Sequence, residues 1–283
     1  MTLVIAHRLN NHISLSSDSR LTFGTAGHID YGIKIFSIPV KIYSPTSFET
    51  DITNLEYNYK LGLAIVGSAI CAYTVKESVS EILQNLQYIP NYMDISLKAI
   101  AKLVFKVFRQ TTLDLGDIIQ KNGICELILT GYCPVQSKIR IFKFTCDTST
   151  YPIKPEYNET LKDNGMTFWG SGQTEANLIY STDTNLSPLH IIRQVIKDKK
   201  IATVGGGLQY GEFNNNNNFK IYGVEDYILN DNGTFKEYLY TLRGITLYRN
   251  QFESEEDEFH IAYTFKRPFE EEINVVFNKQ DIY

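Results

Sequence analysis

The sequence contains few of the residues that disulfide frameworks and metal sites need. Its 283 residues include only 4 cysteines and 5 histidines. The cysteines (Cys71, Cys125, Cys133 and Cys146) show no C-x-x-C spacing and are too sparse for a disulfide framework. The histidines show no metal-like spacing. We therefore expect free thiols in a reducing compartment, no metal site and no cofactor.

Long apolar runs and an excess of positive charge are also missing. No run of about eighteen apolar residues is present, which argues against a membrane-spanning helix, and the N-terminus lacks the basic and apolar regions of a signal peptide. The formal net charge of -5 leaves no basic stripe for nucleic acid. Apolar residues make up 43% of the chain, enough to fill a core. These features predict a cytoplasmic globular protein without a nucleic-acid or membrane partner.

The most informative residue is Thr2, which stands before an apolar run. Removal of Met1 would leave Thr2 at the amino terminus, with no propeptide to cleave. A terminal threonine can supply both nucleophile and base, because its α-amino group, with an unperturbed pKa of about 7.7–8.0, can accept the hydroxyl proton. The alternative is an ordinary first strand, since many proteins begin with Met-Thr.

The spacing of the next charged residues favours the nucleophile. Two short apolar runs flank a turn-prone Asn-Asn pair at positions 10–11, which predicts an antiparallel hairpin that brings Asp18 near Thr2. A third extended run, Gly32–Ile38, carries Lys34 where an inward-facing side chain could reach the same place. A lysine cation there would keep the threonine amine neutral, and Asp18 would hold the lysine charged and oriented.

These residues stand in a recognisable motif. The run from Asp18 reads Asp-Ser-Arg-Leu-Thr-Phe-Gly, and Lys34 follows after a short loop. With Thr2, it resembles a proteasome β-type or bacterial proteasome-like subunit, of the N-terminal-nucleophile (Ntn) hydrolase superfamily, in which Thr, Asp and Lys occupy the same spacing without a gap. The resemblance implies that Thr2 is the nucleophile and that Asp18 and Lys34 are further catalytic residues.

The resemblance continues into a strand that ends at Gly67 and is followed by a helix. It implies that the Gly67 amide donates a hydrogen bond to the oxyanion, which suits a backbone N–H at a helix N-terminus. It also implies that Thr22 and Val66 bind the substrate.

The second half of the chain resembles the same family more weakly. Ser171, in a Gly-Ser-Gly run that opens a helix, takes by resemblance the catalytic role of the family serine that hydrogen-bonds the terminal amine. The alternative interpretation is that Ser171 only caps the N-terminus of the helix. A further family Asp and Ser have no counterpart in residues 201–207, which read Ile-Ala-Thr-Val-Gly-Gly-Gly. Asp198 and Thr203 are the nearby candidates to replace them.

Hydrophobic periodicity predicts strands, two helices, strands and two helices in that order. The expected helices are Ala69–Leu86, Ile95–Thr111, Gln173–Tyr180 and Ser187–Lys197, and the later strands are Ile124–Thr130, Ile139–Phe144, Met166–Trp169 and Val204–Tyr210. This order indicates an α+β protein, and the resemblance implies a four-layer αββα sandwich of two antiparallel sheets flanked by helices, as in Ntn hydrolases.

We expect this αββα domain to span residues 1–211, with a C-terminal extension at 212–283 that packs on the same domain. Alternating residues at Tyr238–Tyr248 and His260–Phe265 suggest extra strands. The run Asn214–Asn218 predicts a mobile loop, and the acidic run at 253–258 predicts a solvated loop.

The leading hypothesis is a proteasome-like N-terminal-threonine hydrolase that cleaves amide bonds, chiefly in peptides. By resemblance it would form a homo-oligomeric ring or stacked rings, with an unidentified unfoldase as a further partner. One alternative is a catalytically silent scaffold or assembly subunit, favoured by the missing downstream Asp and Ser. Another is an Ntn amidase that acts on a small non-peptide amide.

Overall fold

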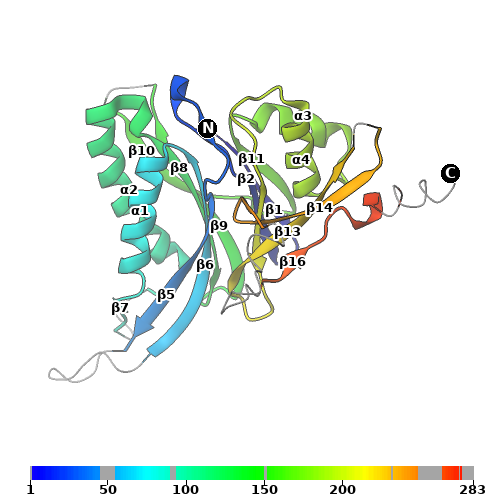
Figure 1. Cartoon of the computed structure of the whole chain (residues 1–283). Coiled ribbons are helices and arrows are strands. Elements are labelled where there is room, and N and C mark those ends of the chain that lie inside the picture. Colours follow the sequence, from blue (N-terminus) through cyan, green and yellow to red (C-terminus); the bar gives the residue numbers. More distant parts are fainter. Residues whose placement is uncertain are drawn as a thin grey trace, which may run out of the picture.

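Two large sheets form most of the structure, a computed structural model that describes residues 2–44, 55–89, 94–149, 152–230, 232–247, 263–273 and 275. Helices lie against the outer faces of these sheets (Figure 1). Most neighbouring strands are antiparallel, so the expected α+β class with antiparallel sheets is confirmed.

The first sheet contains the N-terminal hairpin and most of the C-terminal strands. Its order is β11 (Gly165–Gly170), β1 (Leu3–Leu9), β2 (His12–Asp18), β12 (Leu208–Phe213), β13 (Phe219–Leu229), β14 (Phe235–Leu242) and β15 (Ile245–Thr246), with β16 (Phe265–Lys266) parallel to β13. The predicted β1–β2 hairpin is confirmed, and Asn10 takes the left-handed conformation in its turn, with φ of 57°.

The second sheet is built from the middle of the chain. Its order is β10 (Lys154–Thr160), β9 (Lys138–Asp147), β8 (Cys125–Cys133), β6 (Leu55–Gly67), β5 (Ile35–Tyr43) and β7 (Leu86–Gln87), of which β7 is parallel to β5. Between β2 and β5 the chain forms a small ribbon of β3 (Leu21–Thr22), a 3-10 turn η1 (Gly24–Ala26) and β4 (His28–Ile29).

The two sheets pack face to face through an apolar core. Val4 and Ala6 of β1 contact this core from one sheet, and Ala64 and Val66 of β6 from the other. Because side chains alternate along a strand, the intervening residues of β1, such as Leu3, point to the opposite face. The end of β1 that carries Thr2 therefore lies at the junction of the two sheets.

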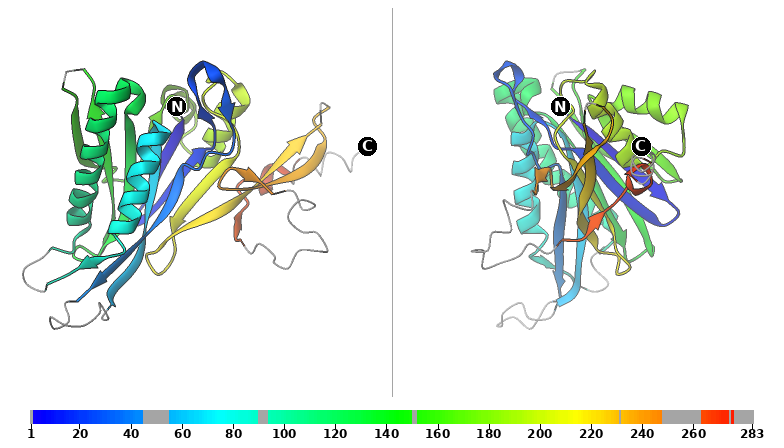
Figure 2. Two further views of the ribbon diagram at one scale, coloured as in Figure 1. Left: turned by 60° about the vertical axis from the view of Figure 1, so that its left-hand side comes forward. Right: turned by 45° about the vertical axis from the view of Figure 1, so that its right-hand side comes forward.

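Helices cover the outer faces. α1 (Ala69–Ile82) and α2 (Leu97–Ile119), followed by η2 (Gln120–Gly123), share a core with the second sheet, and α3 (Gln173–Thr182) and α4 (Pro188–Asp198) share one with the first sheet (Figures 1 and 2). Helix α2 begins where Ser96 Oγ accepts a hydrogen bond from Ala99 N at 3.2 Å, and Ser187 caps α4 in the same way. None of the described helices is long and apolar enough to span a membrane.

Several predicted boundaries were wrong. Helix α1 ends at Ile82 because the following residues turn into β7, and α2 runs beyond Thr111 to Ile119. Gly116 is tolerated inside α2 since Ile153 packs where its side chain would be, with Cδ1 only 2.7 Å from an added Cβ. Strand β12 starts at Leu208 because the preceding glycine-rich residues form a loop around the end of β2.

The C-terminal residues continue the first sheet, since β13 pairs with β12. The Asn214–Asn218 run forms a defined turn, in which Asn214 Oδ1 accepts hydrogen bonds from the amides of Asn216 and Asn218, each at 3.0 Å. Met1, the acidic run at 253–258, Tyr248 and residues 260–262 lie outside the described part of the chain. The division at 211/212 stays a prediction.

Candidate functional site

Asp18, at the end of β2, is the centre of a buried hydrogen-bond network. Five donors surround its carboxylate: Oδ1 accepts from Thr2 Oγ1 at 2.6 Å, Leu3 N at 2.9 Å and Lys34 Nζ at 2.9 Å, and Oδ2 accepts from Arg20 N at 3.1 Å and Gly205 N at 3.0 Å. Thr2, Asp18 and Lys34, which the spacing placed together, are therefore in direct contact through one carboxylate.

These three side chains are almost completely removed from solvent. The exposed fraction is 2% for Thr2, 0% for Asp18 and 1% for Lys34. Burial lowers the pKa of the Lys34 amine below its ordinary value, although the neighbouring Asp18 carboxylate acts in the opposite direction. Removing one partner of such a pair would leave a buried charge without compensation.

The local sequence explains how the three residues meet. The β1–β2 hairpin pairs Val4 with Ser17, so Thr2 and Asp18 emerge at the same end of the first sheet. Lys34 directly precedes β5 of the second sheet. The site therefore lies where the two sheets meet, close to the N-terminus in Figure 1.

A buried glutamine that the sequence did not indicate holds the Lys34 segment. Gln209 of β12 has an exposed fraction of only 1%. Its Oε1 accepts hydrogen bonds from Lys34 N at 2.9 Å and Ile35 N at 3.2 Å, and its Nε2 donates to Gly32 O at 2.7 Å. No pattern in the sequence marks Gln209, because its partners are backbone groups of a segment about 175 residues away in the chain.

The loop between Asp18 and Lys34 is tied to the glycine-rich segment. Arg20 donates from Nε and Nη2 to the two carboxylate oxygens of Asp30, at 2.7 and 2.9 Å, which raises the pKa of Arg20 and lowers that of Asp30. Ser19 Oγ donates to Asp30 O at 2.6 Å and accepts from Gly207 N at 2.7 Å. These contacts hold Asp30, which precedes Lys34 in the same segment, against the end of β2.

Ser171 lies beside Thr2, with Thr203 as its partner. The two hydroxyl oxygens are 2.6 Å apart, and Ser171 Oγ donates to Thr2 O at 3.4 Å. Of the two residues considered as replacements for the missing Asp and Ser, Thr203 therefore joins the network. Asp198 instead lies at the end of α4, where its carboxylate is 4.0 Å from Lys200 Nζ.

The other predicted site residues, Gly67, Val66 and Thr22, make no direct contact of this kind with Thr2. Gly67 is an exposed residue that ends β6 with φ of 90°, and Ser68, the N-cap of α1, follows it. The Val66 side chain is in the core between the sheets, and the Thr22 hydroxyl is buried. Within the described ranges, no hydrogen bond joins these three residues to Thr2, and the Thr22 hydroxyl has no hydrogen-bond partner.

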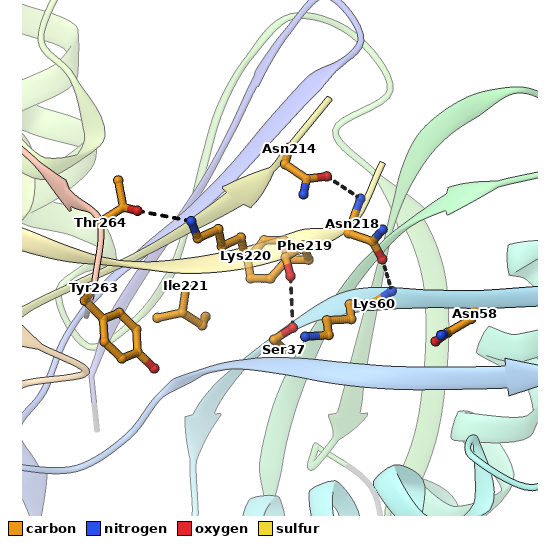
Figure 3. A pocket seen from close by; sticks show the side chains of 10 residues that line it. All are labelled: Ser37, Asn58, Lys60, Asn214, Asn218, Phe219, Lys220, Ile221, Tyr263 and Thr264. Carbon is orange, nitrogen blue, oxygen red and sulfur yellow. Dashed lines mark hydrogen bonds between the residues drawn. The ribbon is translucent and has the colours of Figure 1, made fainter. Parts of the chain in front are cut away.

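A groove of about 680 Å³ lies elsewhere, between β5, β6 and β13 (Figure 3). Ser37, Lys60 and Lys220 are among its lining residues, and none of the predicted site residues is. We therefore locate the candidate site by its network of buried polar groups rather than by the size of a cavity. In the part of the chain that the structure describes, no group of three or more His, Cys, Asp or Glu side chains could hold a metal ion.

The fold is similar to that of solved Anbu proteins. The helical assembly of the Anbu complex from Pseudomonas aeruginosa has a TM-score of 0.53 and 15% identity over 78% of this chain and 85% of that chain. Anbu (ancestral beta-subunit) from Yersinia bercovieri has a TM-score of 0.50 and 14% identity over 74% and 81%. The Gly-1 mutant of Anbu from Hyphomicrobium sp. strain MC1 has a TM-score of 0.53 and 12% identity over 78% of this chain and 87% of that chain.

These likenesses establish the fold alone, because all three identities are low. No family model and no curated protein matches the sequence. The predicted membership of the proteasome β-type subunits was wrong, since these solved structures are Anbu proteins. The spacing of Thr2, Asp18 and Lys34 describes one hairpin and one neighbouring strand, so it could not distinguish between families that share this local geometry.

We expect Gln209→Leu to destabilise the protein by at least about 2 kcal/mol, because each buried backbone group left without a partner costs about 1–3 kcal/mol. Urea denaturation measures this loss. Gln194→Leu, at an exposed position of α4, is the matched control and should change stability by less than about 0.5 kcal/mol. Equal effects of the two substitutions would show that Gln209 does not hold the Lys34 segment.

Gly170→Ala should disturb Thr2 whereas Gly165→Ala should not. Both glycines are in β11 with positive φ, 96° and 141°, so both substitutions strain the backbone. Only at Gly170 would the new Cβ overlap Thr2 O, at 2.1 Å; at Gly165 no atom lies within 4 Å. We expect Gly170→Ala to cost about 1–3 kcal/mol more in thermal unfolding. Indistinguishable losses would contradict the close packing of Gly170 on Thr2.

Proposed function

We propose that this protein is an N-terminal-threonine hydrolase that cleaves an amide bond after Met1 is removed. The observation that carries the proposal is the contact of Thr2 Oγ1 with Asp18 Oδ1 at 2.6 Å, on the same oxygen that holds Lys34 Nζ at 2.9 Å. A hydroxyl at the head of β1 that shares a carboxylate oxygen with a buried lysine is arranged for nucleophilic attack once its own amine is free.

The proposed reaction proceeds through an ester. Thr2 Oγ attacks the amide carbon while the α-amine of Thr2 takes the hydroxyl proton and passes it to the leaving amine. Lys34 supplies positive charge beside the reacting oxygen, and Asp18 keeps Lys34 in place. The amide of Gly67, an exposed residue just before the Ser68 N-cap of α1, is the proposed oxyanion donor. Water then hydrolyses the ester and restores Thr2.

Two hydroxyl side chains are proposed to hold the freed amine. Ser171 and Thr203 form a pair at 2.6 Å, and Ser171 also contacts the Thr2 carbonyl. A hydroxyl pair accepts hydrogen bonds from the amine without adding negative charge. Because it leaves the amine uncharged more readily than a carboxylate would, we expect catalysis to remain strong near neutral pH.

The broader context follows from the same proposal. We infer that the two packed sheets and their outer helices are the four-layer αββα arrangement of Ntn hydrolases, with a peptide as the first substrate class to test. The solved Anbu complex from Pseudomonas aeruginosa is a helical assembly, which supports a homo-oligomer for this chain. A cytoplasmic location remains part of the proposal.

A scaffold without turnover is the second candidate. It is favoured by one observation: the segment that carries an Asp and a Ser in the resembled family reaches Asp18 here through the backbone amide of Gly205. The site therefore has no second carboxylate from that segment.

The test is the intact mass of the protein purified from its own host, with and without an epoxyketone, which reacts with a terminal threonine through both hydroxyl and amine. We expect a chain without Met1 that gains one adduct, and no adduct on Thr2→Ala. Thr74→Ala, at an exposed threonine of α1, is the matched control and should react like the wild type. The reaction should accelerate as pH rises through the pKa of the amine, about 7.7–8.0 or lower beside Lys34.

A chain that keeps Met1 and gains no adduct at any pH would contradict the hydrolase and favour the scaffold. An adduct that persists in Thr2→Ala would place the reactive group elsewhere.

A further inference from the structure

Two buried cysteines outside the proposed catalytic network lie in direct contact. Cys71 is in the first turn of α1 and Cys125 begins β8, 54 residues later. Their sulfur atoms are 3.3 Å apart, and the exposed fractions of the two residues are 0% and 1%. A disulfide requires an S–S distance of about 2.05 Å, so closing the gap needs a movement of roughly 1.3 Å.

The surroundings of the two thiols shift their pKa values in opposite directions. The hydrogen bond from Cys125 lowers the pKa of Cys71 to about 7, with Thr112 contributing in the same direction, whereas the pKa of Cys125 is raised. The position of Cys71 near the N-terminus of α1 also favours its thiolate. Cys71 is therefore the nucleophilic sulfur and Cys125 the resolving one.

This pair adjoins the proposed oxyanion donor. Gly67 is the direct strand partner of Cys125, and a Cβ added at Gly67 would lie 3.2 Å from Cys125 Cα and 2.9 Å from Ile124 O. Ser68 N also donates to Ile124 O, at 3.0 Å. Any shift of the start of β8 relative to the first turn of α1 must therefore move the backbone around Gly67, because Gly67 packs directly against Ile124 and Cys125.

We propose that Cys71 and Cys125 form a reversible disulfide that regulates the site by changing the backbone around Gly67. The effect on catalysis rests on the function proposed above for Gly67 and Thr2, whereas formation of the disulfide does not. The oxidant is a small hydroperoxide, since an uncharged molecule close to water in size can enter through local opening of the first turn of α1. Ile70 in that turn is 64% exposed, so the turn lies at the surface.

The chemistry balances in two steps. The Cys71 thiolate attacks one oxygen of hydrogen peroxide, the O–O bond breaks, and the hydroxide released takes up a proton to become water. The Cys125 sulfur then attacks the sulfenic sulfur of Cys71 and displaces hydroxide, which takes the Cys125 proton to give a second water. Overall, two thiols and one peroxide yield one disulfide and two waters, and a dithiol reductant reverses the reaction.

The first measurement asks whether the disulfide forms. The full chain is treated with hydrogen peroxide, alkylated under denaturing conditions, and analysed by intact mass and peptide mapping. We expect a linked Cys71–Cys125 peptide about 2 Da lighter than its two thiol peptides together, and an intact protein that carries two fewer alkyl groups than the reduced control, both reversed by dithiothreitol before alkylation. Cys133→Ala, which alters a buried cysteine at the other end of β8, should behave like the wild type. Cys71→Ala and Cys125→Ala should each abolish the link.

Cys146 serves as an internal control because it is partly exposed. If Cys146 is oxidised while both Cys71 and Cys125 remain available to alkylation, the disulfide proposal is overturned. Peptide mapping makes this decision in the wild-type protein, so it does not depend on whether either alanine variant folds.

The second measurement asks whether the disulfide acts on the site. Oxidation should slow hydrogen exchange in residues 67–72 and slow epoxyketone labelling of Thr2 by about tenfold or more, since loss of one oxyanion donor costs about 10²–10³ in rate. In Cys71→Ala, peroxide should change neither. A disulfide that leaves both exchange and labelling unchanged would overturn the regulatory role. Absence of labelling in both redox states would contradict the proposed function, and hydrogen exchange would then decide the structural coupling.

Discussion

The structure depends on one buried carboxylate. Asp18 receives hydrogen bonds from donors in four separate segments: the head of β1, the residues after β2, the residue before β5 and the glycine-rich loop before β12. Removing such a carboxylate from water is favourable only when donors and a positive charge compensate for the lost hydration. The four segments must therefore converge on Asp18, and their convergence fixes the two sheets relative to each other at this end.

The same constraint connects the fold to chemistry. The carboxylate that requires Lys34 as a counter-ion also orients the Thr2 hydroxyl, so the groups that stabilise the junction are those proposed for catalysis. Gln209 extends this arrangement, because its side-chain amide, on β12 of the first sheet, positions the backbone of Lys34 where the second sheet begins. The likeness to Anbu proteins shows that the fold occurs elsewhere, whereas the reaction depends on these side chains and on the state of the amino terminus.

The sequence predicted the site where its geometry is local. Thr2 and Asp18 are joined by one hairpin, and Lys34 directly precedes the next long strand, so short spacing was sufficient. Gln209 was not predictable, because its role arises from a strand pairing between distant segments. The length of α2 was also underestimated: the predicted helix ended at Thr111, whereas α2 continues to Ile119, with Ile153 packed against Gly116. The family was also wrongly assigned, since the resemblance was based on short motifs, and the solved structures that share this fold are Anbu proteins.

The most direct test of the role of Asp18 is a double-mutant cycle with Asp18→Asn and Lys34→Met, measured by urea denaturation. Each single substitution leaves a buried group without its charged partner, so each should cost about 3–5 kcal/mol. If Asp18 and Lys34 form the pair on which the junction depends, the double variant should lose at least about 2 kcal/mol less than the sum of the single losses. If the loss in the double variant equals the sum of the two single losses within about 0.5 kcal/mol, this dependence is contradicted.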